Sequence, residues 1–166
     1  MKKIFLVTVV VLLVLSTSFF AGSAPTASAK ELKILEFDTM VGNPPAFTGA
    51  TNPIRGINGG GAPWTVGSAS GELTVGGHLE ITVQGLVLVA TGSNPIASFR
   101  AIVSCLKSDG GVQNILTDAF PATTGLASAG GGNAKIEANL TLPQPCIAPI
   151  IFVTSATGSW FAATGF

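Results

Sequence analysis

Charged side chains are scarce in this chain of 166 residues, where Asp, Glu, Lys and Arg together make up 10% of the sequence. An average globular domain carries about 25%. The surface must therefore be built largely from Thr, Ser, Asn, Gly and Ala, and such a surface resists self-association poorly. This composition favours self-association, or attachment to a glycan or another partner in the cell envelope. A monomer with few charges is the other interpretation.

The first 29 residues have the order of a secretory signal peptide. Lys2 and Lys3 form a short basic start, an apolar stretch from Ile4 to Leu15 follows, and small residues end at Ala29. This order is typical of a cleaved leader, and the apolar stretch is too short for a membrane span, which needs about 20 residues. We expect cleavage after Ala29, a single secreted domain over residues 30–166, and no membrane span after cleavage. The lysine pair and the glycine-rich, charge-poor body resemble small secreted proteins of bacteria.

Basic residues are few once the leader is removed. Without Lys2 and Lys3, six basic residues face eight acidic ones. A domain that binds nucleic acid through its phosphates has a basic stripe, and none is present here. We therefore exclude a nucleic-acid partner.

A helical period is also missing after the leader. Short segments with alternating or continuous apolar residues are separated by turn signals, a pattern typical of strands. Gly85 interrupts one of them and predicts a bulge or a bend between two sheets, and Asp109-Gly110 predicts a hairpin. We expect an all-β fold, a β-sandwich of about eight short antiparallel strands, immunoglobulin-like or jelly-roll-like, with a closed barrel as the second choice. The expected strands are 31–37, 72–75, 78–90, 98–106, 112–120, 134–142, 150–155 and 160–166.

Only two cysteines are present, Cys105 and Cys146. An even number of cysteines in an exported chain predicts a disulfide. The bond closes a loop of about 40 residues, for which the chain-entropy model gives about 4 kcal/mol of stabilisation. Cys146 lies in the proline-rich segment 142–149, and we expect the bond to fasten this segment, as a sheet edge, to the core.

The segment 38–64 is long, rich in glycine and proline, and without a regular pattern. Long loops in compact domains are often functional, so this is the first place to look for a site. Its glycines allow the loop to turn sharply or allow another chain to approach the backbone. The candidate binding residues are Arg55, Asn58, Trp64 and Trp160. The two tryptophans are either exposed rings that stack on sugars or anchors of the core.

Candidate catalytic groups are few. Any triad must use His78, the only histidine, with Glu80 on the same strand face as an orienting group or a metal ligand; the simpler alternative is the polar side of a half-exposed strand. Glycosidases need two neighbouring carboxylates, and either Glu72 with Glu80 or Glu80 with Glu137 could meet. If Arg100 is buried it needs a partner, for which Glu80 or Glu137 would serve.

These observations favour a secreted, non-catalytic module with a binding, surface or assembly role. One alternative is a carbohydrate-binding module that uses Trp64 and Trp160, and the other is a secreted hydrolase that uses His78. The sequence calls for no cofactor and no metal. A structural calcium ion stays an open alternative, but no run of ligands requires it.

Overall fold

Eight strands of four or more residues form the framework of the protein. The structure, a computed structural model, describes residues 31–165, so the predicted leader lies outside the described residues. Each of the eight strands overlaps one of the eight expected segments, although several ends differ, and the all-β prediction is confirmed. They are β1 (Lys33–Phe37), β4 (Ser68–Thr74), β5 (His78–Gln84), β8 (Ser98–Leu106), β9 (Val112–Leu116), β12 (Ala134–Asn139), β13 (Ile147–Thr154) and β14 (Trp160–Ala163).

Shorter elements connect these strands. Six strands of two residues and two 3-10 turns lie between them. They are β2 (Val41–Gly42), η1 (Pro45–Phe47), β3 (Trp64–Thr65), β6 (Val87–Leu88), β7 (Ser93–Asn94), β10 (Phe120–Pro121), β11 (Gly125–Leu126) and η2 (Ala127–Ala129).

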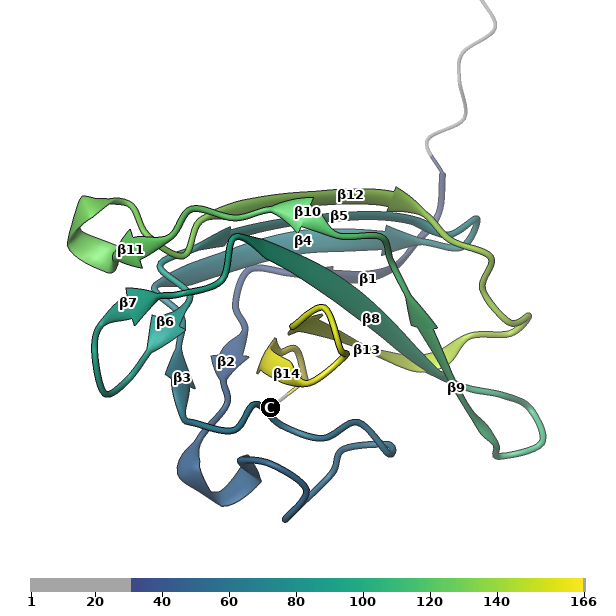
Figure 1. Cartoon of the computed structure of the whole chain (residues 1–166). Helices are drawn as coiled ribbons and strands as arrows, with labels where there is room; N and C mark the ends of the chain where they lie inside the picture. Colours follow the sequence, from purple (N-terminus) through teal and green to yellow (C-terminus); the bar gives the residue numbers. More distant parts are fainter. Residues whose placement is uncertain (1–30, 166) are drawn as a thin grey trace, which may run out of the picture.

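Two antiparallel sheets pack face to face in a sandwich-like arrangement (Figure 1). The first sheet has the order β1-β4-β5-β12. The second has the order β10-β8-β13-β14-β2, with β9 also paired to β8. A single bridge between Ala122 and Ala134 links the two sheets along one side, next to β10 and β12. The side of β1 has no such bridge among the described residues, as in a sandwich-like arrangement.

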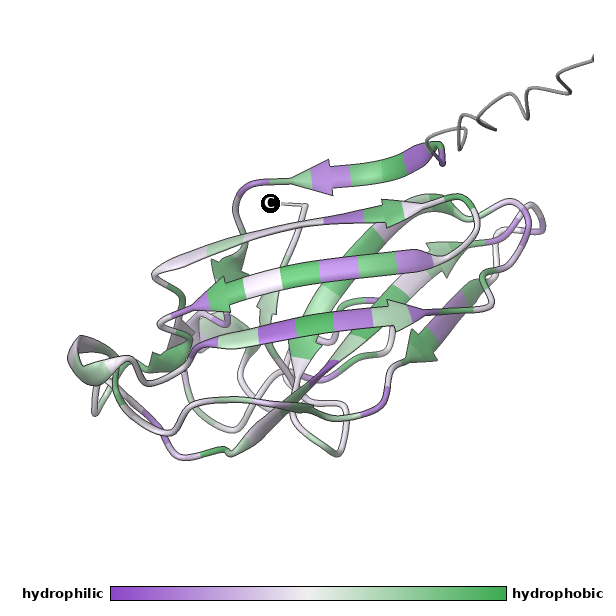
Figure 2. Cartoon of the chain, turned by 90° about the horizontal axis from the view of Figure 1, so that it is seen from above, coloured by the Kyte–Doolittle hydropathy of each residue, from purple (hydrophilic) through white to green (hydrophobic). Residues whose placement is uncertain are grey.

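The main core lies between the two sheets. In β5 the odd-numbered residues Leu79, Ile81 and Val83 are buried, while the residues between them are half-buried. Figure 2 shows the same alternation as stripes along β5 and β12. From the second sheet, Phe99 and Val103 of β8 complete this core. The period of two in the sequence therefore sets which face of each strand is buried.

Gly85 ends the run of β5 in the first sheet. Its φ angle is 64°, in the left-handed region that favours glycine. The chain then leaves the sheet, and β6 pairs with β3 in a separate two-stranded sheet. The predicted bend at Gly85 is confirmed.

The hairpin between β8 and β9 is also as expected. The N–H of Gly110 donates to the carbonyl of Lys107, and Gly110 has a φ angle of 79°. The strands pair in a regular antiparallel register from Leu106 opposite Val112 to Ile102 opposite Leu116.

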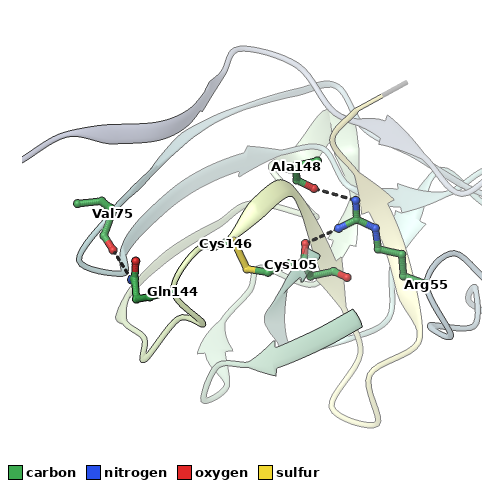
Figure 3. Close-up of a disulfide and its surroundings, with 7 residues drawn as sticks. Arg55, Val75, Cys105, Gln144, Cys146 and Ala148 are labelled. Carbon is green, nitrogen blue, oxygen red and sulfur yellow. Dashed lines mark hydrogen bonds between the residues drawn. A yellow bond between two sulfur atoms is a disulfide. The ribbon is translucent and has the colours of Figure 1, made fainter. Parts of the chain in front are cut away.

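Cys105 near the end of β8 is bonded to Cys146, which directly precedes β13, with an S–S distance of 2.02 Å (Figure 3). The predicted disulfide is confirmed. Beside the bond, β13 pairs with β8 alone, because its pairing with β14 is limited to Phe152, Val153 and Thr154. The bond therefore fastens a part of β13 that is locally at the sheet edge, as expected, although β13 farther along lies between β8 and β14. The proline-rich segment is the crossing from β12 in the first sheet to β13 in the second.

The long segment between β1 and β3 packs on the outer face of the second sheet. Ile57 of this segment is buried against Ile102, Phe152 and Trp160, which point away from the main core and form a second cluster. Gly59 is buried there, and a β-carbon on it would lie 1.9 Å from the carbonyl oxygen of Phe47. The glycines therefore serve the close approach of the chain to itself, and much of the loop is a structural cover.

Candidate functional site

A row of four glutamates crosses the outer face of the first sheet. Glu36 of β1 is opposite Glu72 of β4, Glu72 is opposite Glu80 of β5, and Glu80 is opposite Glu137 of β12. The sequence suggested that Glu72 could meet Glu80 and that Glu80 could meet Glu137, and both pairs are adjacent in the sheet. Like charges directly opposite each other in a sheet are destabilising unless they are balanced.

Two lysines balance this row. The ammonium of Lys33 lies 2.7 Å from a carboxylate oxygen of Glu36 and 2.5 Å from one of Glu72. That of Lys135 lies 3.0 Å from Glu80 and 3.3 Å from Glu137. Hydrogen bonds to these carboxylates raise the pKa of both lysines above the ordinary value. Each of the four carboxylates is thus paired with one of the two lysines.

A hollow of about 700 Å³ lies over this face, which we call the acidic groove. It combines carboxylates, hydroxyl groups and one aromatic ring. Gly71 lies beneath the ring of Phe37, since a β-carbon on Gly71 would lie 2.7 Å from the tip of that ring. The lining residues are Glu36, Phe37, Asp38, Ser70, Gly71, Glu72, Glu80 and Thr82.

The sequence pattern indicated only part of this groove. It pointed to Glu72 and Glu80, but not to Glu36, Phe37 or Asp38 at the end of β1. The alternation along β1 is visible in the sequence, whereas its register against β4 includes an irregularity between Lys33 and Leu35 that the sequence does not reveal.

Asn58 borders a second and smaller hollow of about 320 Å³. Asn58 is exposed, and Asn114 of β9 also lines the hollow. The remaining lining residues are Gly56, Ile57, Ile102, Leu116, Thr157, Gly158 and Ser159. The predicted loop therefore lines this cavity with Gly56, Ile57 and Asn58, and Ile57 also covers the second sheet.

Arg55 is held by the backbone of two strands. Its guanidinium donates to the carbonyl of Ser104 in β8 at 2.7 Å and to that of Ala148 in β13 at 2.8 Å (Figure 3). Its own carbonyl accepts a hydrogen bond from the side chain of Asn114, and partial burial lowers the pKa of the guanidinium. Arg55 thus fastens the loop to the second sheet, beside the disulfide, and is not part of the rim of either hollow.

Both tryptophans are anchors of the core. Trp64 is 5% exposed and stacks on Phe161 with ring centroids 4.1 Å apart, and Trp160 is fully buried with Phe47 and Phe152 around it. Of the two alternatives, the structure supports core anchors. The four candidate binding residues do not meet in one site.

His78 and Glu80 share a strand face, as expected, but they bind different partners. The Nδ1 atom of His78 lies 3.1 Å from Oδ1 of Asn139, whereas Glu80 binds Lys135. Glu80 is therefore not placed as the orienting group of a histidine base. The hydrolase alternative stays a prediction without support from this pair.

The expected partners of Arg100 are wrong. Its guanidinium donates to the carbonyl of Ala156 at 3.1 Å, while Glu80 and Glu137 belong to the other sheet and bind Lys135. Arg100 of β8 pairs with Thr154 at the end of β13. The carbonyl of Ala156, in the turn that follows β13, is therefore within reach of Arg100.

Residues 31–165 contain no group of three or more His, Cys, Asp and Glu side chains arranged to hold a metal ion. Within the same range, no helix is long and apolar enough to cross a membrane. No family model matches the chain, and no curated protein and no solved structure is significantly similar to it.

Proposed function

We propose that the protein is an exported, non-catalytic module that binds an amine-bearing glycan in the acidic groove. Export is supported by the order of the first 29 residues and by the disulfide, since disulfides persist in oxidising compartments. The observation that carries the binding role is the hollow of about 700 Å³ over the first sheet.

The two outer faces of the sandwich differ in a way that favours this site. The loop segment around Ile57 covers the second sheet. The first sheet instead presents half-buried polar side chains, among them Glu72, Glu80 and Thr82. An open polar face with a hollow is a suitable surface for an extended, hydrated ligand.

The chemistry of the lining favours a ligand that carries amines and hydroxyl groups. Carboxylates accept strong, charge-assisted hydrogen bonds from ammonium groups. The hydroxyls of Ser70 and Thr82 can both donate to and accept from sugar hydroxyls, and half-buried Phe37, which also packs against the main core, adds apolar atoms to the lining. Five of the eight acidic residues after the leader lie in or beside the groove, namely Glu36, Asp38, Glu72, Glu80 and Glu137.

The test is calorimetric titration of the protein without its leader with a glucosamine oligomer, at a pH where its amines are protonated. An N-acetylglucosamine oligomer of the same length is the matched ligand. We expect the free-amine oligomer to bind at least tenfold more tightly, and Glu72→Gln or Glu80→Gln to weaken it about tenfold, as for a lost charged hydrogen bond.

Asp118→Asn is the control protein, because it removes the same charge at an exposed position outside the groove. It should bind like the wild type. Failure of the wild type to bind the free-amine oligomer, or equal binding by the groove variants, would overturn the proposal.

A further inference from the structure

The edge strands of the two sheets carry different features that hinder pairing with another chain, and β9 is the exception. Exposed strand edges pair with other chains unless charge, proline, irregularity or short length prevents it. β1 carries Lys33 and Glu36, β12 carries Lys135 and Glu137, and β2 and β10 have two residues each. β9 has five residues without charge or proline, in unbroken register with β8.

The hydrogen-bond pattern shows which groups of β9 point outward. The N–H of Thr117 donates to the carbonyl of Ala101, which fixes Thr117 as a residue bonded to β8. Bonded and non-bonded residues alternate in an antiparallel pair. The backbone groups of Val112, Asn114 and Leu116 therefore point away from β8, and within residues 31–165 β9 pairs with no other strand.

This pattern is complementary to itself. If two copies of β9 run antiparallel about a two-fold axis at Asn114, each Asn114 faces its equivalent and each Val112 faces Leu116 of the other copy. All three positions are then hydrogen-bonded pairs, and the axis generates six backbone bonds. The register also places Val112 and Leu116, which are 43% and 42% exposed, in apolar cross-strand pairs.

We propose that the protein forms a symmetric dimer in which β9 of one copy pairs with β9 of a second copy and joins the two second sheets into one. A second copy fits this edge because the symmetric register satisfies every outward group without bringing like charges together. The charge-poor surface offers little electrostatic repulsion against it. The inference concerns the second sheet and does not depend on the groove.

A charge-swap experiment tests both the edge and the register. The variant Val112→Lys/Leu116→Lys places lysine opposite lysine in the dimer, whereas Val112→Lys/Leu116→Glu places lysine opposite glutamate. Within one copy both variants replace the same two partly exposed side chains with charges. Molar mass is measured by light scattering over a range of concentrations, and circular dichroism checks that each variant is folded.

We expect the wild type and the lysine–glutamate variant to be dimers at high concentration and the double-lysine variant to be a monomer. A monomeric wild type overturns the proposal, whatever else binds this edge. A dimeric double-lysine variant overturns the β9 interface, and a monomeric lysine–glutamate variant overturns the register.

Amide hydrogen exchange on the wild type gives an independent test that needs no variant. The amides of Val112, Asn114 and Leu116 should exchange rapidly in dilute solution and become protected as the concentration rises. The amides of Gln113 and Ile115, which face β8, should be protected at all concentrations. Concentration-independent exchange at the three outward amides would contradict the dimer.

Discussion

Glu72 of β4 and Glu80 of β5 lie directly opposite each other on the outer face of the first sheet. Such a pair of like charges is unfavourable by itself. It is placed between Lys33, which binds Glu72, and Lys135, which binds Glu80. The stability of this face therefore depends on the two lysines, which differ in burial.

Lys33→Met should lower the midpoint of thermal unfolding more than Lys135→Met. Each lysine joins two carboxylates, but the side chain of Lys33 is 21% exposed and that of Lys135 is 58% exposed. Solvent screens the more exposed network more strongly. Calorimetry of both variants at pH 7 is the measurement, and an equal or larger effect at Lys135 would contradict the expectation.

The contribution of Lys33 should also depend on alkaline pH. Its folded pKa is raised above 10.5 by hydrogen bonds to Glu36 and Glu72. Stabilisation by the charged form is thus complete below the unfolded pKa and is lost as the pH rises through the folded pKa. The difference in midpoint between wild type and Lys33→Met should narrow above pH 10.5, and a constant difference would count against this cause.

Asp109 should make the stability of the β8–β9 hairpin sensitive to acid. Its carboxylate accepts from the N–H of Gly111 at 2.8 Å and from Lys107 at 3.0 Å, and these bonds lower its pKa below 3.8. The stabilisation is present above the unfolded pKa and is lost as the pH falls through the lower folded pKa.

Asp109→Asn is the matched variant, because its amide oxygen can accept from Gly111 but does not titrate. Denaturant unfolding from pH 5 to pH 2 should show a larger loss of stability for the wild type than for the variant. Titration of the Asp109 carboxyl carbon by NMR checks the pKa directly, and a midpoint at or above 3.8 would contradict the assignment.

Gly59→Ala and Gly61→Ala should differ sharply, although both glycines belong to one run of three. A β-carbon at Gly59 meets the backbone of Phe47 at 1.9 Å, whereas one at Gly61 has no neighbour within 4 Å. Overpacking of this kind costs about 1–3 kcal/mol, and an exposed substitution stays within about 0.5 kcal/mol. Urea unfolding of the two variants measures the contrast, and equal stabilities would show that the loop does not pack tightly here.

Local patterns predicted the fold well because they depend on neighbours in the sequence. The alternation in β5 and the turn at Asp109-Gly110 are fixed by side-chain direction and by backbone conformation. The site was predicted less well because it depends on register between distant strands. Nothing in the sequence shows that Glu36 lies beside Glu72, or that the loop around Ile57 covers the second sheet.

Trp64 and Trp160 should be shielded from iodide and acrylamide in solution. Both rings are buried, the first on Phe161 and the second under the loop. Fluorescence quenching of the native protein should be weak and should rise on unfolding in urea. Strong quenching in the native state would return the sugar-stacking alternative to consideration.

Removal of the disulfide should destabilise the fold by about 4 kcal/mol, the chain-entropy value for a closed loop of this length. The bond spans 41 residues and connects β8 to the start of β13, so the unfolded chain loses a long-range constraint when the bond is removed. The double variant Cys105→Ala/Cys146→Ala, compared with the wild type by urea unfolding, gives the difference, and reduction of the wild type should shift its midpoint in the same direction.

Because Arg55 holds the carbonyls of Ser104 and Ala148 next to the bond, Arg55→Met in the disulfide-free background should cost more stability than in the wild type. Equal costs in the two backgrounds would mean that the disulfide and the arginine stabilise this part of the second sheet independently.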